Sequence, residues 1–517
     1  MLILDRPRAG VMVPLFSLRS GSGWGVGEYP DLPRFAAWAS RAGFSCVLTL
    51  PLLEPSPGQD SPYASCSFFA LDPLYLAIDA VPDFAGRASL TPQETALLED
   101  VEGAPRVSHD KVRKLKLAVL ERCFTSFESA PSPERARDLA RFEAEHAHWL
   151  PAYALFRTLK AHRHGSWRDW PAPLRDAEPS ALATARVEHV REIRFRTYMQ
   201  WLAFRQLEAA RAATNALGVG LIGDEPFLVA DDAADVWAHQ DRYRTDATVG
   251  APPDAFSAEG QEWGLPPYRW DALKTQSYAL FHERGAHTAK LYDAIRIDHV
   301  VGLYRTYLRP RDKTKKPYFD PEKQPDQLAQ GEAVLKALGA SGTEVIAEDL
   351  GVIPDWVRLS LEKLAIPGHR VLRWEQEQGR YREPRTYPEL SLATTGTHDT
   401  ETSAEWWDAL GEWERAAFTS LDGMKHLATK DHERWDDPVW AALLWKTISA
   451  PSRLVILPIQ DVLSLRARIN TPNTMGPENW SMRLPWTLPA MESDAILGAR
   501  TKLVRKLCSD HGRLPAG

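Results

Sequence analysis

Eight short apolar runs recur along the chain, and stretches with helical spacing of apolar residues separate them. The runs cover residues 10–18, 44–53, 219–227, 292–301, 343–348, 369–374, 390–397 and 453–459. Before the third run, Phe195, Tyr198, Met199 and Leu202 follow the i, i+3, i+4, i+7 spacing that places one apolar stripe on a helix. Nearly continuous apolar runs of this length indicate parallel strands covered on both faces. Strand followed by helix, repeated eight times, predicts an α/β fold of the (β/α)8 TIM-barrel type.

Two intervals between the runs are longer than a strand-to-helix connection needs. Residues 78–192 have a mostly helical pattern, and we expect them to form a helical insertion at the C-terminal face of the barrel. Residues 231–289 are rich in loops, and long loops on this face usually carry function or cover a site. After Trp486 no long alternating tail follows, so no C-terminal β-sandwich is expected. Residues 1–517 are therefore interpreted as one barrel domain with two insertions.

Three segments of the chain lead from small or apolar residues into an acidic residue, at Asp298, Glu348 and Asp399. The C-terminal ends of barrel strands meet at one face, so we expect the three carboxylates to lie around a common site. Cleavage at the anomeric carbon of a sugar needs a nucleophilic carboxylate, a protonated acid for the leaving oxygen, and stabilisation of positive charge in the transition state. The trio therefore indicates chemistry at a glycosidic bond.

The neighbours of two of these acids sharpen the assignment. Arg296 lies two residues before Asp298 on the predicted strand, so both side chains point to the same face and the guanidinium keeps the carboxylate ionised. Glu348 is followed by Asp349, and two like charges close together raise a pKa. One member of this pair is expected to stay protonated at neutral pH, as a general acid must.

Each acid alone also has a structural interpretation. Asp298 can cap a helix or form a salt bridge, and residues 348–349 can open the helix that follows Pro354. His398 and Asp399 can form a hydrogen-bonded pair in the core. The occurrence of all three acids at the same end of their strands favours the catalytic interpretation.

Composition excludes several other classes of protein. The net charge is −7 with a pI near 6.1, and no basic stretch with interleaved aromatic residues is present, so nucleic acid is not an expected partner. No apolar run is long enough to span a membrane, and residues 1–4 are too short for the core of a signal peptide. The four cysteines are scattered without a C-x-x-C motif, which indicates a reduced, cytoplasmic protein.

No cofactor and no metal ion are expected. Carboxylate chemistry needs neither, and no loop of the calcium-binding type is visible. His146 and His148, like His162 and His164, are two residues apart on predicted helices, so the members of each pair face away from each other. We interpret them as surface residues.

Seven segments follow in the order typical of one enzyme family: 60–65, 223–226, 256–264, 296–299, 347–351, 397–400 and 470–472. Over nearly its whole length the sequence resembles the amylomaltase, or 4-alpha-glucanotransferase (disproportionating enzyme), family, glycoside hydrolase family 77. The resemblance implies a retaining transfer of an α-1,4-glucan segment from a donor maltooligosaccharide or glucan to the 4-hydroxyl group of an acceptor sugar. Maltooligosaccharides and α-1,4-glucans are accordingly the expected binding partners, and residues 231–289 are expected to cover the glucan groove.

The resemblance also assigns roles to individual residues. It implies that Asp298 is the nucleophile, Glu348 the general acid/base and Asp399 the stabiliser of the transition state. The substrate-binding residues that it implies are Ser61, Tyr63, Asp224, Gln261, Trp263, Arg296, His299, His398 and Asn470. Tyr63 would stack on the sugar under attack, and Gln261 and Trp263 would lie in a loop that covers the groove.

The chain departs from the family pattern at three places near the predicted site: Leu265, residues 302–305 and residues 371–375. These departures bear on the preferred donor and acceptor, because the catalytic trio is intact. Two alternatives stay open. One is a hydrolase or isomerase of the wider amylase clan, which would use the same trio, and the other is a glucan-binding protein that has kept the barrel without catalysis.

Overall fold

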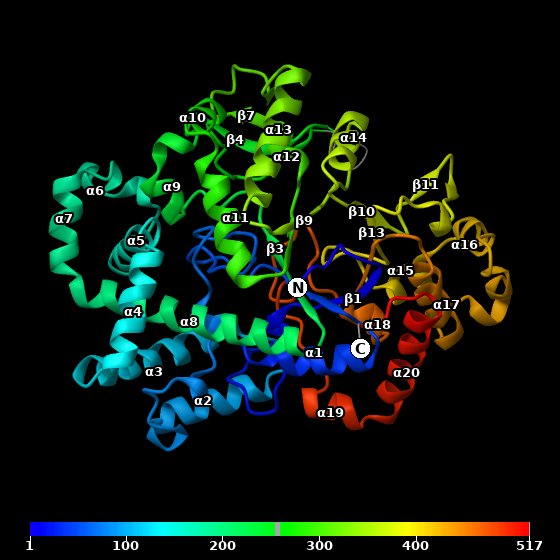
Figure 1. Ribbon diagram of the computed structural model, residues 1–517, viewed down its shortest axis with the longest axis horizontal. Coiled ribbons are helices and arrows are strands. Elements are labelled where there is room, and N and C mark those ends of the chain that lie inside the picture. Colours follow the sequence, from blue (N-terminus) through cyan, green and yellow to red (C-terminus); the bar gives the residue numbers. More distant parts are fainter. Residues whose placement is uncertain (254–258, 516–517) are drawn as a thin grey trace.

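The computed structural model of the protein describes residues 1–253 and 259–515. Its centre is a closed barrel of parallel strands in the order β1-β14-β13-β10-β9-β6-β3-β2 (Figure 1). The strands are β1 (Arg8–Met12), β2 (Cys46–Leu48), β3 (Gly220–Glu225), β6 (Ala294–Ile297), β9 (Glu344–Ala347), β10 (Gly368–Val371), β13 (Ser391–Thr394) and β14 (Leu454–Pro458). Each strand overlaps one of the eight predicted runs. The predicted TIM barrel is therefore confirmed.

Helices surround the barrel, so its strands are buried on both faces (Figure 1). The helices between or after barrel strands include α1 (Asp31–Arg41), α8 (Val190–Ala216), α11 (Ala279–Leu291), α12 (Val301–Tyr304), α13 (Gln324–Gly339), α14 (Asp355–Lys363), α17 (Asp437–Ile448) and α18 (Ile459–Val462). Apolar side chains on both faces of the strands explain why the runs are almost continuously hydrophobic.

The strand register sets the level at which the acids emerge. Glu225 at the end of β3 is the partner of Ile297 on β6, and Ile297 is in turn the partner of Ala347 on β9. Asp298 and Glu348 directly follow these partners, so they leave the barrel side by side at its C-terminal end. The ladder continues for one further step, because the backbone N–H of Glu348 donates to the Ile297 carbonyl over 3.0 Å.

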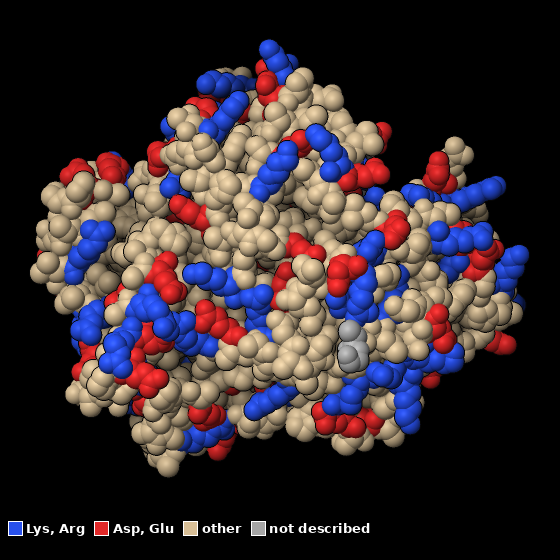
Figure 2. All heavy atoms as spheres, viewed as in Figure 1, with Lys and Arg blue, Asp and Glu red and all other residues tan. Residues whose placement is uncertain are grey.

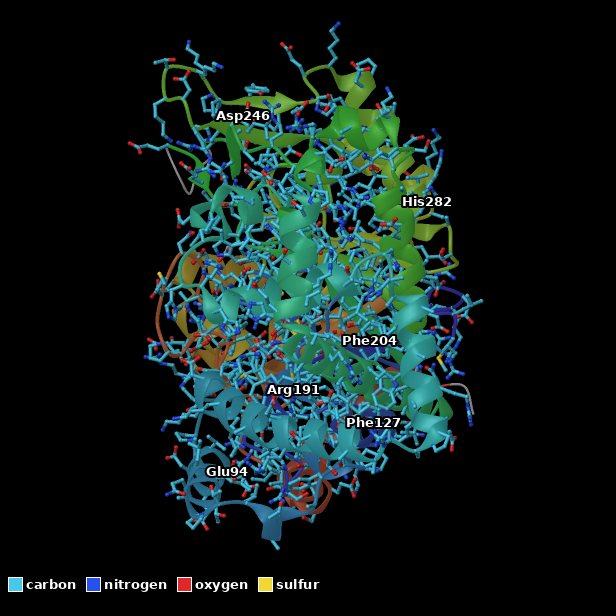
Figure 3. The ribbon with its side chains drawn as sticks, turned by 90° about the vertical axis from the view of Figure 1, so that its left-hand side faces the viewer. Glu94, Phe127, Arg191, Phe204, Asp246 and His282 are labelled. Atoms are coloured by element: carbon cyan, nitrogen blue, oxygen red, sulfur yellow. The ribbon has the colours of Figure 1, made fainter. Side chains whose placement is uncertain are left out.

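Between β2 and β3 the chain forms a layer of helices at one side of the barrel (Figures 1 and 3). These are α2 (Pro92–Gly103), α3 (His109–Ser129), α4 (Pro133–Glu145), α5 (Leu150–His162), α6 (Ala172–Arg175) and α7 (Pro179–Glu188), and the chain then enters the long α8. Proline begins α2, α4 and α7, where its missing N–H leaves no hydrogen bond unmade. Aromatic contacts of Phe124 and Phe127 with Tyr198 fasten α3 to α8.

A second group of elements lies outside the barrel after β3 and β6. A small antiparallel sheet has the order β5-β4-β7-β8. Its elements and neighbours are α9 (Ala234–Ala238), β4 (Ala247–Ala251), β5 (Gln261–Glu262), α10 (Trp270–Thr275), β7 (Thr306–Pro310) and β8 (Tyr318–Asp320). Residues 231–289 thus contribute β4 and β5 to this sheet, and their last part belongs to the barrel helix α11.

The C-terminal third completes the ring of helices. It contains the hairpin β11 (Gln376–Glu377) and β12 (Arg380–Tyr381), followed by α15 (Ser403–Ala409), α16 (Glu412–Thr419), α19 (Leu488–Ser493) and α20 (Ala495–Asp510). Short 3-10 helices cover 15–17, 73–75, 78–80, 87–89, 167–169, 240–242, 384–386, 425–427 and 430–432. Past β14, the described residues form helices and loops and no further strand.

The distribution of surface charge and the state of the cysteines can be compared with what the composition predicted. On the face drawn in Figure 2, lysine and arginine are interspersed with aspartate and glutamate, and no broad area of one charge is present. All four cysteines are free and buried. None of the helices in the described parts of the chain combines the length and the apolar character that a membrane crossing requires.

Candidate active site

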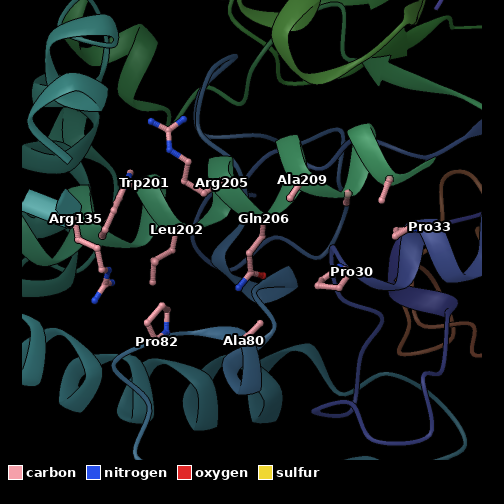
Figure 4. A pocket seen from close by; sticks show the side chains of 12 residues that line it. Pro30, Pro33, Ala80, Pro82, Arg135, Trp201, Leu202, Arg205, Gln206 and Ala209 are labelled. Atoms are coloured by element: carbon pink, nitrogen blue, oxygen red, sulfur yellow. The ribbon is translucent and has the colours of Figure 1, made fainter. Parts of the chain in front are cut away.

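The C-terminal end of the barrel opens into a cavity of about 1100 Å³. Among its lining residues are Tyr63, Phe227, Gln261, Trp263, Arg296, Asp298, His299, Glu348, Asp349, His369, Trp374, Glu375, His398, Asp399 and Pro472. The three predicted catalytic carboxylates therefore face one space. A smaller groove of about 440 Å³ follows α8 outside the barrel, and among the described residues that line it no carboxylate occurs (Figure 4). The barrel cavity is consequently the candidate active site.

Asp298 follows β6 directly and keeps 29% of its side chain exposed to the cavity. The Arg296 guanidinium is 3.1 Å from its Oδ1, as the shared strand face predicts. The same Arg296 Nη1 is 2.7 Å and 2.8 Å from the two carboxylate oxygens of Asp224, which lies within β3. One buried guanidinium thus contacts two carboxylates. Asp298 also lines the cavity, where its carboxylate is accessible to a substrate.

Glu348 follows β9 directly and is oriented by two backbone groups. The N–H of His299 donates to its Oε2 over 2.7 Å, and the N–H of Leu350 donates to its Oε1 over 2.8 Å. Burial raises the pKa of Glu348, the negative charge of Asp298 raises it further, and together they outweigh Arg296 and the two N–H groups to bring it to about 7. A substantial fraction of this carboxyl group is therefore protonated at neutral pH.

The expectation that Asp349 would supply the like charge beside Glu348 differs from the structure. Asp349 accepts a hydrogen bond of 2.6 Å from the backbone N–H of His369 and is 3.3 Å from the Arg370 guanidinium. It is thus held by β10 and its neighbouring cations. The charge that raises the pKa of Glu348 comes instead from Asp298 on the adjacent strand. Adjacent residues at a strand end point to opposite sides, whereas residues on neighbouring strands at one level face each other.

Asp399 lies in the loop after β13 and is held in the ionised state. Burial alone would raise its pKa, but the neighbouring His398, whose Nε2 is 3.4 Å from Oδ2, and a hydrogen bond from Asn470 lower the pKa to about 2. The Asn470 amide donates to Oδ1 over 2.7 Å, and Arg468 donates to the Asp399 backbone carbonyl over 2.8 Å. Conversely, Asp399 raises the pKa of His398 above its usual value, although burial acts in the opposite direction.

An aromatic group closes one side of the cavity around Tyr63. Its hydroxyl donates to Asp224 over 2.6 Å and is 3.2 Å from His398 Nδ1. The Tyr63 ring stacks on the His398 ring with centroids 4.8 Å apart, and Trp480 packs on both rings. Ser61 supports this arrangement from behind, because its hydroxyl accepts the backbone N–H of Tyr63 over 3.3 Å.

His299 and the loop that carries Trp263 form the opposite side. His299 has a φ of 46°, which is rare for a residue other than glycine, and this conformation directs its N–H to Glu348. Burial lowers the pKa of His299 to about 4, so its ring is neutral. Trp263 meets that ring edge to face at 4.8 Å and donates its indole N–H to Gln261 over 3.0 Å.

Most of the predicted binding residues line the cavity, and three of them act from behind its wall. Asp224, Ser61 and Asn470 contact Tyr63, Arg296 or Asp399 and lie outside the main lining. Of the family-like segment 256–264, residues 256–258 lie outside the described residues. The remainder includes Gln261 and Trp263, which face the cavity.

Several residues of the cavity were not predicted from the sequence to have a role. Trp374 and Glu375 follow β10, and the same rule that selected the three acids, a polar or aromatic residue at a strand end, applies to them. Trp374 is 52% exposed in the cavity wall. Trp480 and Arg468 carried no sequence signal, because they belong to loops far along the chain from Tyr63 and Asp399.

The barrel and its paired carboxylates define an enzyme that acts on glycosidic bonds. The profile of glycoside hydrolase family 77, described as 4-alpha-glucanotransferase, matches residues 13–488. This chain belongs to that family. The resemblance inferred from the seven sequence segments is confirmed.

Individual relatives can be aligned with this chain over most of their length. The 4-alpha-glucanotransferase of Chlamydia pneumoniae is 33% identical over 520 residues, which cover 96% of this chain and 94% of that protein. The 4-alpha-glucanotransferase of Thermus thermophilus is 34% identical over 501 residues, covering 93% of this chain and 95% of that protein. The solved amylomaltase from Streptococcus agalactiae, in complex with acarbose, shares the fold with a TM-score of 0.83 at 23% identity, over 99% of this chain and all of that chain (100%).

Proposed function

We propose that the protein transfers an α-1,4-glucan segment from a donor maltooligosaccharide or glucan to the 4-hydroxyl group of an acceptor sugar, with retention of configuration at the anomeric carbon. The observation that carries the proposal is the pairing of Asp298 with Glu348 at the ends of adjacent strands. One of these carboxylates contacts an arginine, and the other has a pKa raised to about 7. Family membership, with relatives named 4-alpha-glucanotransferase, supports the choice of reaction.

In the first half-reaction Asp298 would attack the anomeric carbon while Glu348 protonates the departing glycosidic oxygen. The bond between the anomeric carbon and that oxygen breaks, and an ester between the anomeric carbon and the Asp298 carboxylate forms. The protonated fraction of Glu348 supports its role as the acid. Asp399, with its pKa lowered to about 2, would remain negative and stabilise the oxocarbenium-like transition state.

In the second half-reaction Glu348, now ionised, would take the proton from the 4-hydroxyl group of an acceptor sugar. That oxygen attacks the anomeric carbon and releases Asp298, which restores both carboxyl groups. Transfer exceeds hydrolysis only when a sugar and not water reaches the intermediate. Trp263 and Gln261 lie at the cavity beside His299, where a bound acceptor and this loop would together exclude water.

The shape and lining of the cavity support a chain of several sugar units as substrate. Its volume of about 1100 Å³ is larger than a single sugar needs, and Tyr63, Trp263 and Trp374 line it together with the acids. These aromatic rings offer flat apolar surfaces on which sugar rings stack.

Product analysis with a single substrate tests the proposal. Incubation with maltotriose should give glucose together with a ladder of longer maltooligosaccharides, and the total number of reducing ends should stay constant. Mass spectrometry of the ladder, with a reducing-end assay alongside, measures both quantities. Glucose and maltose alone with rising reducing ends would indicate the hydrolase alternative, and rearranged trisaccharides of unchanged mass would indicate an isomerase. Saturable binding without any product would indicate a glucan-binding protein.

We also propose a cytoplasmic location. All four cysteines, Cys46, Cys66, Cys123 and Cys508, are free and buried, as expected for a protein of a reducing compartment. Fractionation of the source cells, with detection of the protein by antibody, tests this assignment.

A further inference from the structure

Two histidines and a glutamate converge on one point where α5 ends and α8 begins. His162 is the last residue of α5, His189 caps the start of α8, and Glu192 lies in the first turn of α8. One ligand atom from each residue lies within 4.8 Å of the others. Helix α5 and the start of α8 belong to the helical layer beside the barrel (Figure 1), and none of the three residues lines the cavity that holds the carboxylate trio.

The three side chains already contact one another. His162 Nε2 forms a hydrogen bond of 2.5 Å with Oε2 of Glu192, and His189 Nδ1 is 3.7 Å from the same oxygen. The two imidazole rings are 4.6 Å apart between centroids, with 31° between their planes. A tetrahedral zinc ion with bonds of about 2.0–2.1 Å keeps its ligand atoms about 3.4 Å apart. The contact of His162 with Glu192 would have to open by about 0.9 Å and that of His189 with Glu192 to close by about 0.3 Å, so a bound ion would replace the hydrogen bond between His162 and Glu192.

The chemistry of the donor set selects the class of ion. Two imidazole nitrogens and one carboxylate oxygen suit divalent zinc and neighbouring transition metals, whereas calcium and magnesium prefer a shell of oxygen atoms. The side chains of His162 and Glu192 are 47% and 46% exposed, so an ion can enter from solvent and water can complete its coordination. Zn²⁺, a borderline-soft cation, readily accepts three protein ligands and leaves a fourth position for water.

The position of the cluster indicates what a bound ion would do. The two helices also meet where the Gln200 amide on α8 donates to the Tyr153 hydroxyl on α5 over 3.0 Å. Gln200 in addition hydrogen-bonds both backbone groups of Leu71, at 3.0 Å and 2.8 Å, in the segment that follows Tyr63. An ion bound where α5 ends and α8 begins would crosslink the two helices that contact this segment.

We propose that His162, His189 and Glu192 form a binding site for a divalent transition-metal ion of the zinc class, and that the ion stabilises the helical layer. The site was not expected from the sequence. The spacing of His162 and His164 concerns only that pair, whereas the second histidine of this cluster comes from a different helix.

Metal binding by the full-length, tag-free protein tests the proposal. After treatment with a chelator, equilibrium dialysis against Zn²⁺ with elemental analysis should give one ion per chain, and the midpoint of thermal unfolding should rise with Zn²⁺. Binding should weaken as the pH is lowered, because protons compete with the metal ion for the imidazole nitrogens. Substitution of a Co²⁺ ion should give the visible absorption of a tetrahedral centre.

Two ligand variants and one matched control complete the experiment. His189→Ala and Glu192→Gln should each weaken Zn²⁺ binding by at least about tenfold, since loss of even an indirect supporting partner has that effect on metal sites. His282→Ala removes an exposed histidine on α11 and should bind as the wild type does (Figure 3). Uptake that does not saturate at one ion, or equal uptake by wild type and both ligand variants, would overturn the proposal. Circular dichroism of each variant excludes misfolding as the cause of a loss.

Discussion

The two ends of the barrel hold carboxylates on the same two strands, β6 and β9. The carboxylates at the two ends differ in the groups that surround them. At the N-terminal end, Asp293 precedes β6 and Glu344 begins β9. At the C-terminal end, Asp298 and Glu348 follow those strands. The four residues are alike in chemistry and in closeness to a strand end, so any difference in role comes from what surrounds them.

The acids at the N-terminal end are saturated with donors. Asp293 accepts hydrogen bonds from the terminal ammonium group at 2.8 Å, from Arg211 at 2.9 Å and from the backbone N–H of Leu221 at 2.8 Å. Burial alone would raise its pKa, but these donors lower it. Glu344 accepts the backbone N–H groups of Ile3 and Leu4. These carboxylates tie the start of the chain to the barrel.

The acids at the C-terminal end share one large cavity and interact with each other electrostatically. Asp298 has one contacting cation where Asp293 has two, and Glu348 accepts two backbone N–H groups as Glu344 does but has the like charge of Asp298 beside it. The comparison teaches that an acid at a strand end is not by itself a catalytic signal. The distinguishing features are the shared barrel cavity, the sparse pairing of Asp298 and the raised pKa of Glu348.

The largest expected effect separates Asp298 from Asp293. Asp298→Asn should reduce turnover of maltotriose by about 10⁴-fold or more, since it removes the proposed nucleophile, while binding of maltooligosaccharides stays near the wild-type value. Initial rates of glucose release and calorimetric titration measure the two quantities. The matched variant Asp293→Asn should lower the midpoint of thermal unfolding and leave the rate per folded molecule within a few-fold of wild type. Comparable rate losses in both variants would contradict the comparison.

The next effect separates Glu348 from Glu344. Glu348→Gln should reduce turnover of maltotriose by about 10²–10⁴-fold, because the departing sugar oxygen is no longer protonated. A donor with a fluoride leaving group needs no proton, so its first half-reaction should be nearly as fast in this variant as in wild type. Stopped-flow measurement of fluoride release checks this. Glu344→Gln should affect thermal stability only, and equal slowing of both donors in Glu348→Gln would refute the acid role.

The pH profile sharpens the same comparison. The first half-reaction, as proposed, needs the protonated form of Glu348, whose pKa is raised to about 7. The value of kcat/KM should therefore be lost as the pH rises through about 7, by about tenfold for each further pH unit. Initial rates across the neutral and alkaline range, in buffers of constant ionic strength, provide the profile. If kcat/KM is instead lost with a midpoint near the ordinary glutamate pKa of about 4.3, the surroundings of Glu348 do not raise its pKa.

The smallest expected effect concerns the loop over the cavity. Trp263→Ala should raise the fraction of donor that is hydrolysed by a few-fold and change the total rate less, because water gains access to the intermediate. The ratio of reducing ends to transfer products measures this fraction. Trp413→Ala removes an indole that is 68% exposed on α16, and it serves as the control with an unchanged ratio. If both variants keep the wild-type ratio, the proposed role of the loop is wrong.

The sequence predicted the barrel and the trio because both depend on regular features. Apolar strands with polar ends repeat along the chain, and a barrel brings all C-terminal ends to one face. The contact of Arg296 with Asp298 was predictable in the same way, because residues two apart on a strand share a face. Within a strand, the periodicity of the sequence is sufficient to predict which side chains share a face.

The parts that could not be predicted depend on contacts between loops or between separate elements. The like charge beside Glu348 belongs to Asp298 and not to its sequence neighbour Asp349, because side chains across a register level lie closer than those on opposite faces of one strand. Trp480 packs on Tyr63 from a loop more than four hundred residues away. The pairing of His162 with Glu192 likewise joins two helices whose packing no spacing rule specifies.

Trapping of the covalent intermediate tests the central claim most directly. Glu348→Gln should react with a maltosyl fluoride donor but lack the base for the second half-reaction, so a glycosyl ester should accumulate. Mass spectrometry of the intact protein, followed by digestion, should place one added maltosyl group on the peptide that contains Asp298. Attachment to a different carboxylate, or release of fluoride with inversion of configuration and no adduct, would contradict the account.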